Sequence, residues 1–150
     1  MYWLMKSEPE VYGISDLQAE GKTIWDGVRN YQARNFLRQM QVGDRAFFYH
    51  SNTRPPGIAG LMQITAAQVI DPTQFEATSP YFDPKATPAA PRWQTVEVAF
   101  EQQFPKLLTL ALLREHFTDA ELLILRRGNR LSVVPVDAPV AQKILALANG

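Results

Sequence analysis

Residues 23–40, TIWDGVRNYQARNFLRQM, hold the densest set of recognition-type side chains in the chain. An indole offers a stacking surface, amide groups offer paired donors and acceptors, and guanidinium groups bind phosphates. These are the components of a pocket for a nucleobase. The residues concerned are Trp25, Arg29, Asn30, Tyr31, Arg34 and Arg38.

The same residues also have a purely structural interpretation. In that interpretation Trp25 belongs to the core, Tyr31 fills space between elements, and the arginines form the solvated face of a helix. Stacking of one base on one aromatic ring contributes roughly 1 to 3 kcal/mol, so a single aromatic residue does not make a binding site. The residue types alone leave both interpretations open.

Sequence patterns for catalysis and for metal binding are weak. Ser7 and Ser51 lack the G-x-S-x-G context of a nucleophile, and the chain has no phosphate-binding loop. The chain has no cysteine, and its two histidines, His50 and His116, stand far apart. We therefore expect no metal and no cofactor, and the pattern favours binding over catalysis.

The composition indicates one domain covering residues 1–150. Apolar residues make up 46% of the chain, and no apolar run approaches the ~18 residues of a membrane span. The first ten residues, MYWLMKSEPE, do not resemble a secretory signal, so we expect a cytoplasmic protein with no membrane partner. The formal net charge is zero, so nucleic-acid binding would depend on a local basic patch.

The elements that must position the recognition residues can be read from periodicity and capping signals. Residues 2–6 predict a strand, and Ser15 with Gln18 predicts a capping box for a short helix over 16–20 that Gly21 ends. Asn30 is a good N-cap for the next helix, whose apolar residues fall at helical spacing.

The remainder of the chain predicts further strands and short helices. Strands are expected over 45–51, over 58–70 as one piece or two, over 93–100 and near 131–136; helices are expected over 107–117, over 119–125 and after Asp137. Residues 71–91 contain five prolines but also aromatic residues, which predicts an ordered loop. The order of elements favours an α+β fold, with a mixed, mostly antiparallel sheet or small barrel and peripheral short helices.

Several stretches, taken in order, closely resemble the EVE domain: YWLMKSEP, WDGVRNYQARNFLR, VGDRAFFYHSN, GIAGLMQI, YFDPKA, RWQTVEVAF and RRGNRLSVVPV. The EVE domain belongs to the PUA-like superfold and is related to the YTH readers of methylated adenine. The resemblance implies a curved, mixed β-barrel with helices around it. It also implies a pocket for a flipped-out modified base, chiefly a modified cytosine in DNA, with RNA also proposed.

The resemblance implies roles for particular residues. Trp25 would form one wall of an aromatic cage and Tyr81 or Phe82 the opposing wall. Lys6 and Ser7 match a Lys-Ser pair that borders the pocket in relatives. Asn30 and Tyr31 would read the base edge or hold the Trp25 loop. His50 and Ser51 would line the cavity, while Arg29, Arg34 and Arg54 would contact phosphates.

Two alternatives remain beside a modified-base reader. Relatives in the PUA-like ASCH group include hydrolases and nucleases, and Lys6 with Ser7, Tyr49 and Ser51 could be arranged in that way. A lysine in the pocket with a lowered pKa beside a hydroxyl would favour catalysis, and a solvated or acid-paired lysine would favour binding. The second alternative is a sensor of a free nucleoside-like molecule. The expected partners are nucleic acid carrying a modified base and a separate effector protein.

Overall fold

The computed structural model describes the whole chain from Met1 to Gly150, and its central element is a six-stranded sheet in the order β2-β5-β4-β3-β1-β6. β1 and β3 run parallel, and the other neighbouring strands are antiparallel. The strands are β1 (Tyr2–Ser7), β2 (Lys22–Ile24), β3 (Arg45–His50), β4 (Gly57–Ile70), β5 (Gln94–Thr109) and β6 (Val133–Val136). The helices are α1 (Ile14–Glu20), α2 (Tyr31–Gln39), α3 (Leu110–His116) and α4 (Ala138–Asn149), with 3-10 turns η1 (Pro72–Phe75) and η2 (Leu123–Leu125).

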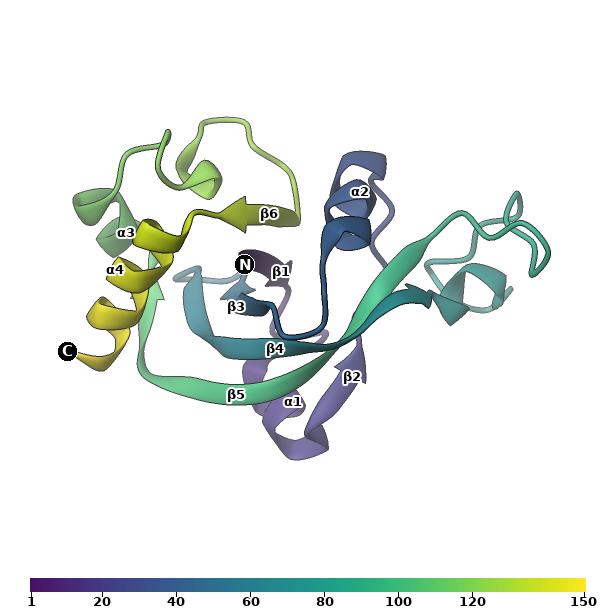
Figure 1. Ribbon diagram of the computed structural model, residues 1–150, viewed down its shortest axis with the longest axis horizontal. Helices are drawn as coiled ribbons and strands as arrows, with labels where there is room; N and C mark the ends of the chain where they lie inside the picture. The colour runs from purple at the N-terminus through teal and green to yellow at the C-terminus, as the bar shows by residue number, and fades with distance from the viewer.

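The sheet is strongly bent but open. β4 and β5 are long strands that curve across the molecule, and their pairing shifts register at several points (Figure 1). β2 pairs only with β5, and β6 pairs only with β1, so the two edges do not meet. The predicted α+β class is confirmed, but the curved β-barrel that the resemblance implies is not, because no hydrogen-bonded pairing joins the edge strands.

Both faces of the sheet are covered, which creates two cores. Side chains alternate along β1, so that Leu4 enters one core while Trp3 and Met5 enter the other. Helices α3 and α4 cover the first core, and α1 and α2 cover the second. Strands buried on both faces need apolar residues at every position, which explains the continuous apolar run of β1.

Capping was predicted correctly for α2 but not for α1. Asn30 Oδ1 accepts a hydrogen bond from the N–H of Ala33 at 2.9 Å, as expected for an N-cap. In α1 the cap is Gly13, whose N–H donates to Asp16 Oδ2 at 2.7 Å. Ser15 therefore lies inside the helix, directly after the buried Ile14.

The second half of the chain differs from the prediction mainly in its helices. β4 is a single strand, and β5 extends to Thr109, so residues 107–109 are strand and not helix. The helix begins afterwards because Thr109 Oγ1 accepts from the N–H of Leu112. Residues 119–125 contain only the turn η2.

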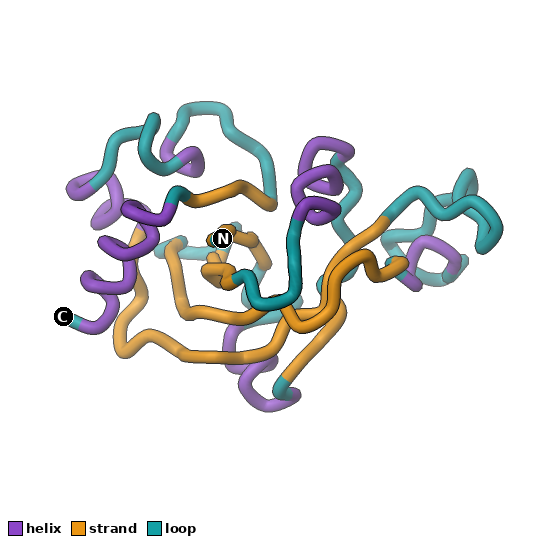
Figure 2. Tube along the Cα trace, in the orientation of Figure 1, coloured by secondary structure: helices purple, strands orange, loops and turns teal.

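Two long loop segments lie at opposite ends of the molecule (Figure 2). One of them, between β4 and β5, is the proline-rich stretch, and it is ordered as predicted, since Gln74 Nε2 donates to the carbonyl of Asp71 at 2.7 Å. The other lies between α3 and β6. None of the helices is long and apolar enough to cross a bilayer.

Candidate functional site

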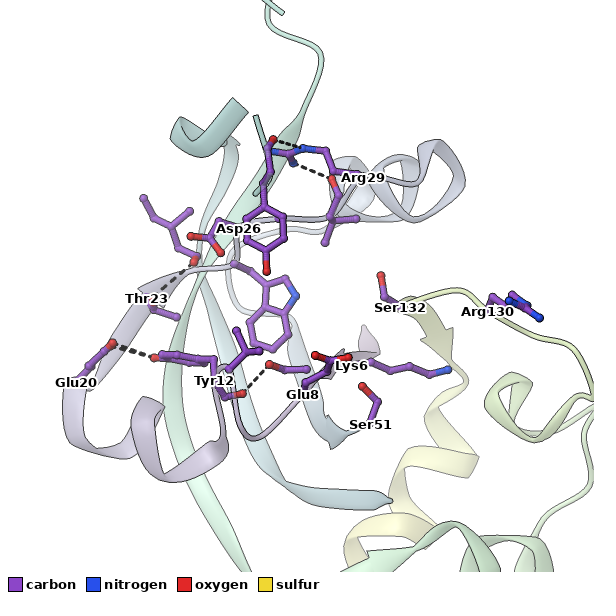
Figure 3. Close-up of a pocket in the computed structure, with 17 residues that line it drawn as sticks. Lys6, Glu8, Tyr12, Glu20, Thr23, Asp26, Arg29, Ser51, Arg130 and Ser132 are labelled. Carbon is purple, nitrogen blue, oxygen red and sulfur yellow. Dashed lines mark hydrogen bonds between the residues drawn. The ribbon is translucent and has the colours of Figure 1, made fainter. Parts of the chain in front are cut away.

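A cavity of about 800 Å³ opens where the ends of β1 and β3 meet the loop between β2 and α2. The N–H of Ser51 donates to the carbonyl of Ser7 at 3.0 Å, and the N–H of Lys6 donates to the carbonyl of Ser132 at 2.8 Å. The loop before β6 therefore completes the wall. Segments from the two halves of the sequence face each other across this space (Figure 3).

Trp25 is both a core residue and a wall of the cavity. Its side chain is 6% exposed and meets Phe48 edge to face, with ring centroids 5.3 Å apart. The indole N–H groups of Trp3 and Trp93 donate to Asp44 and Asp83 at 3.0 and 2.8 Å. The indole N–H of Trp25 has no acceptor in the protein, and it is not sealed from solvent. A buried indole N–H usually has a partner, so this donor is available to a ligand.

Asp71 fixes the backbone of the Trp25 loop. Its Oδ2 accepts from the N–H of Gly27 at 2.9 Å and from Arg29 Nη1 at 3.0 Å, while its Oδ1 accepts from Thr73. Burial by itself would raise the pKa of Asp71, but the hydrogen bonds from Thr73, Gly27 and Arg29 outweigh it and hold the pKa below its usual value. The carboxylate therefore remains charged and holds the Trp25 loop in place through these hydrogen bonds.

Arg29 joins the same loop to the proline-rich segment. Its Nε donates to the carbonyl of Tyr81 at 2.9 Å, and its Nη2 donates to Thr73 Oγ1 at 3.0 Å. With the bonds to Asp71 and to the carbonyl of Val28, four hydrogen bonds engage this guanidinium. Arg29 lines the cavity, but its donors are largely used within the protein.

The charged groups of the cavity divide into those with partners and those without. Glu20 accepts from the hydroxyl of Tyr12 at 3.2 Å, and Glu8 accepts from Asn52 at 2.9 Å. Asp26, Lys6 and Arg130 have no ion pair and no side-chain hydrogen bond to the protein, and they are the groups left for a ligand.

Two of these free groups have shifted pKa values. The surrounding protein withdraws water from the carboxyl group of Asp26 and raises its pKa, and the nearby Asp71 carboxylate adds to the shift. Burial lowers the pKa of Lys6. In the cavity, Lys6 and Arg130 extend to the side of Ser132, while Asp26 lies opposite them (Figure 3).

The structure gathers half of the predicted site residues at the cavity. Those in its lining are Lys6, Ser7, Trp25, Arg29, Ser51 and Tyr81. Those outside its lining are Asn30, Tyr31, Arg34, His50, Arg54 and Phe82. For the residues of both groups, contact with nucleic acid remains a prediction.

Three of the residues outside the lining make contacts within the fold. His50 Nε2 accepts from the N–H of Ile14 at 3.1 Å and so holds the start of α1, and burial lowers the pKa of this histidine. Tyr31 stacks on Trp93 with ring centroids 4.9 Å apart, and the guanidinium of Arg34 lies 4.8 Å from the Tyr31 ring centroid. Arg54 lies exposed in the loop after β3.

Sequence reasoning missed the other residues of the lining, among them Tyr12, Asp26, Arg130 and Ser132. Asp26 had a signal, since it follows Trp25 directly in the stretch with the densest chemistry. Arg130 belongs to RRGNR, which holds three arginines in five residues. Tyr12 and Ser132 had no signal of their own, because only the folded chain brings them to the cavity.

Comparison with known proteins identifies the family. A family model of the EVE domain matches residues 1–147. The chain belongs to the EVE domain family. This EVE domain is 43% identical to human thymocyte nuclear protein 1, over 97% of this chain and 73% of the human protein.

Solved structures of relatives share the fold of this EVE domain. A crystal structure of a protein from Pseudomonas syringae is 48% identical, with a TM-score of 0.95 and 99% of both chains covered. A crystal structure of human THYN1 protein in complex with DNA containing 5-methylcytosine is 41% identical, with a TM-score of 0.92, covering 99% of this chain and 98% of that one. An ASCH protein from Zymomonas mobilis, at 12% identity and a TM-score of 0.56, shares the fold alone.

Proposed function

We propose that this EVE domain binds DNA by accommodating an extruded, modified cytosine in the cavity beside Trp25. The relative solved with DNA containing 5-methylcytosine supports this class of ligand. The cavity volume of about 800 Å³ falls in the range of small-molecule sites, roughly 300 to 1,000 Å³, and is large enough for a nucleotide.

Aromatic side chains supply the first part of the binding energy. Extruding a base costs a few kcal/mol of lost stacking and pairing. Stacking on an aromatic side chain returns roughly 1 to 3 kcal/mol per base. Trp25 packs edge to face on Phe48, and the ring of Tyr81 packs against the backbone of Gly27, so both walls are in place before the base enters.

The observation that carries the proposal is a free donor and a free acceptor in one aromatic cavity. The indole N–H of Trp25 donates to no other residue, and the carboxyl group of Asp26 has no ion pair and no hydrogen bond to another residue. Cytosine offers an exocyclic amine that donates to a carboxylate, and ring acceptors that take an N–H. Thymine and uracil present a carbonyl oxygen where cytosine has the amine, so this oxygen and the Asp26 carboxylate would repel each other.

The preference for a methylated base should be modest. Burial of one methyl group contributes about 0.8 kcal/mol, which corresponds to roughly a fourfold change in affinity. A larger preference requires a modification that forms its own hydrogen bond, such as a hydroxyl group.

Direct binding to short oligonucleotides tests the proposal. Each oligonucleotide carries 5-methylcytosine, cytosine, 5-hydroxymethylcytosine or thymine at one position, in single- and double-stranded DNA and in RNA. We expect tighter binding of modified cytosine than of cytosine, and thymine weakest. Asp26→Asn should reduce the discrimination against thymine, whereas Asp119→Asn, at an exposed carboxylate outside the cavity, should not. Binding with no dependence on the base would contradict the proposal. Selective binding of RNA would mean that the modified base is recognised in RNA and not in DNA.

A second candidate function is hydrolysis, and one observation favours it. Lys6 lies in the cavity with a lowered pKa, and the hydroxyl groups of Ser7 and Ser51 line the same space. Ser7 Oγ donates to the carbonyl of Tyr12 at 2.6 Å, so Ser51 holds the freer hydroxyl group. If the wild type cleaves an oligonucleotide and Lys6→Met does not, hydrolysis is established. If the oligonucleotides stay intact after long incubation with the wild type, binding is left as the activity.

A further inference from the structure

We propose that the arginine loop, residues 126–130, together with Lys6 binds the phosphate groups that flank the extruded nucleotide. This inference rests on the proposed function, since it assigns the backbone contacts of the same site. It makes the ligand a nucleotide within a strand, bound through its phosphates as well as through its base.

The arginine loop is the strongest concentration of unpaired positive charge beside the cavity. Arg126, Arg127 and Arg130 are all exposed, and none of them pairs with a carboxylate. In contrast, the guanidinium of Arg29 is bound to Asp71. The chain as a whole is neutral, so attraction of a polyanion requires a local patch of this kind.

Internal hydrogen bonds give the arginine loop a defined shape. Asn129 Nδ2 donates to the carbonyl of Leu123 at 2.7 Å, and Asn129 Oδ1 accepts from the N–H of Leu131 at 2.8 Å. Gly128 adopts a φ of +79°, which lets the chain turn between the arginines. The neighbouring Leu125 is buried in the core beneath α3 and α4. The three cations are therefore presented from a fixed position.

The arginine loop lies on the side of the cavity where the phosphate groups of a bound nucleotide would be. Arg130 lines the cavity, and the carbonyl of Ser132 holds the N–H of Lys6 at 2.8 Å, which places Lys6 next to the end of the loop. Lys6 and Arg130 extend to one side, and Asp26 lies on the other (Figure 3). A base placed beside Asp26 and Trp25 would direct its sugar and phosphate toward the cations.

Salt dependence of binding separates phosphate contacts from base contacts. Each phosphate contact to DNA adds about 0.9 to the slope of log Kd against log salt concentration, or about 0.7 for a single strand. The test variant changes Arg126→Gln, Arg127→Gln and Arg130→Gln together. The control variant changes Lys106→Gln, Arg114→Gln and Lys143→Gln, three exposed cations outside the cavity, and removes the same charge.

Kd for DNA containing one 5-methylcytosine is measured over a series of salt concentrations for the wild type and both variants. We expect the loop variant to lose roughly two units of slope and to bind about 10- to 100-fold more weakly at low salt, with the control close to wild type. The ratio of Kd values for cytosine and 5-methylcytosine should not change. All three proteins should melt at similar temperatures, because the altered side chains are exposed.

Two outcomes overturn the inference, and they are distinguishable. If the wild type selects modified cytosine but the loop variant keeps its slope, the phosphates bind elsewhere and the proposed function stands. If the wild type selects no base, the proposed function fails and the inference fails with it. A second measurement compares 5-methyl-2′-deoxycytidine with its monophosphate, and equal affinity of the wild type for both would also contradict the inference.

Discussion

The ring of Tyr81 lies directly against the backbone of Gly27, so closely that a Cβ on Gly27 would come within 2.8 Å of the ring. Gly27 also has a φ of +84°, in the left-handed region that only glycine adopts freely. This contact joins the loop that carries Trp25 to the proline-rich loop that carries Tyr81. The two aromatic walls of the cavity are therefore set by one glycine.

Gly27→Ala should destabilise the protein and weaken ligand binding. The left-handed backbone costs about 1 to 2 kcal/mol for a residue with a Cβ, and the Tyr81 ring must also move. Gly21→Ala is the matched control, because Gly21 has a φ of +85° with no atom near its Cβ position. Denaturant unfolding should show a loss in both variants, and only Gly27→Ala should raise the Kd. Equal behaviour of the two variants would mean that the Tyr81 contact is irrelevant to the cavity.

Trp25→Phe should bind modified DNA about 3- to 10-fold more weakly than the wild type. Phenylalanine keeps an aromatic face against Phe48 but removes the unpaired indole N–H, and one hydrogen bond contributes about 0.5 to 1.5 kcal/mol. Truncation to alanine is less informative, because removal of a buried tryptophan costs about 3 to 5 kcal/mol. Isothermal titration gives the affinity, and an unchanged Kd in a folded variant would show that the N–H is unused.

Arg29→Gln should lower the free energy of unfolding by about 3 to 5 kcal/mol, because it leaves the Asp71 carboxylate buried without its ion pair. Arg45→Gln removes the partner of Glu101 from an exposed pair and should cost at most about 1 kcal/mol. Urea unfolding at neutral pH compares the two. If Arg29→Gln weakens DNA binding without a loss of stability, Arg29 is a phosphate contact, as the family resemblance implies.

The stability that Asp71 contributes should depend on pH in a defined direction. Its pKa is lower in the folded chain than in the unfolded chain. The contribution is therefore fully present above the ordinary pKa of an aspartate and disappears as the pH falls through the folded-state value. Unfolding of Asp71→Asn and the wild type, measured from neutral to acid pH, should converge at the acid end. A constant difference would contradict the assignment.

The contribution of Asp26 to stability should depend on pH in the opposite direction. Its pKa is raised in the folded chain, so its contribution to stability is present below the ordinary value and is lost as the pH rises through the folded-state value. Asp26→Asn should therefore be more stable than the wild type at neutral pH, with the two converging in acid. Asp119→Asn serves as the exposed control. A free carboxylate that costs stability is typical of a binding site.

Local signals predicted much of the fold. The strands β1, β3 and β4 follow from runs of apolar and β-favouring side chains, and the cap at Asn30 follows from the hydrogen bond of one amide to a nearby N–H. The apolar content of residues 119–125 predicts a helix, but Leu122, Ile124 and Leu125 are instead buried in the core that α3 and α4 cover. Apolar content indicates burial, and tertiary packing decides the backbone conformation.

Long-range contacts account for what the sequence left open in the site. Trp25 satisfies both of its interpretations, because its ring packs on Phe48 and also faces the cavity. Arg29 could not be recognised as a structural residue, since its partner Asp71 lies 42 positions away. Arg130 reaches the cavity only because β6 pairs with β1.

The hydrogen bond from Lys6 to Ser132 ties the first strand to the end of the arginine loop, so the cavity exists only while the two halves of the chain are assembled. Global unfolding destroys the site, and any ligand that occupies it must stabilise the whole fold. At a ligand concentration 100 times its Kd, the gain is about 2.7 kcal/mol. For a chain of 150 residues this raises the melting temperature by several degrees, roughly 2 to 4 °C per kcal/mol. A thermal-shift screen of nucleosides, nucleotides and oligonucleotides can therefore find the natural ligand, whichever base it carries.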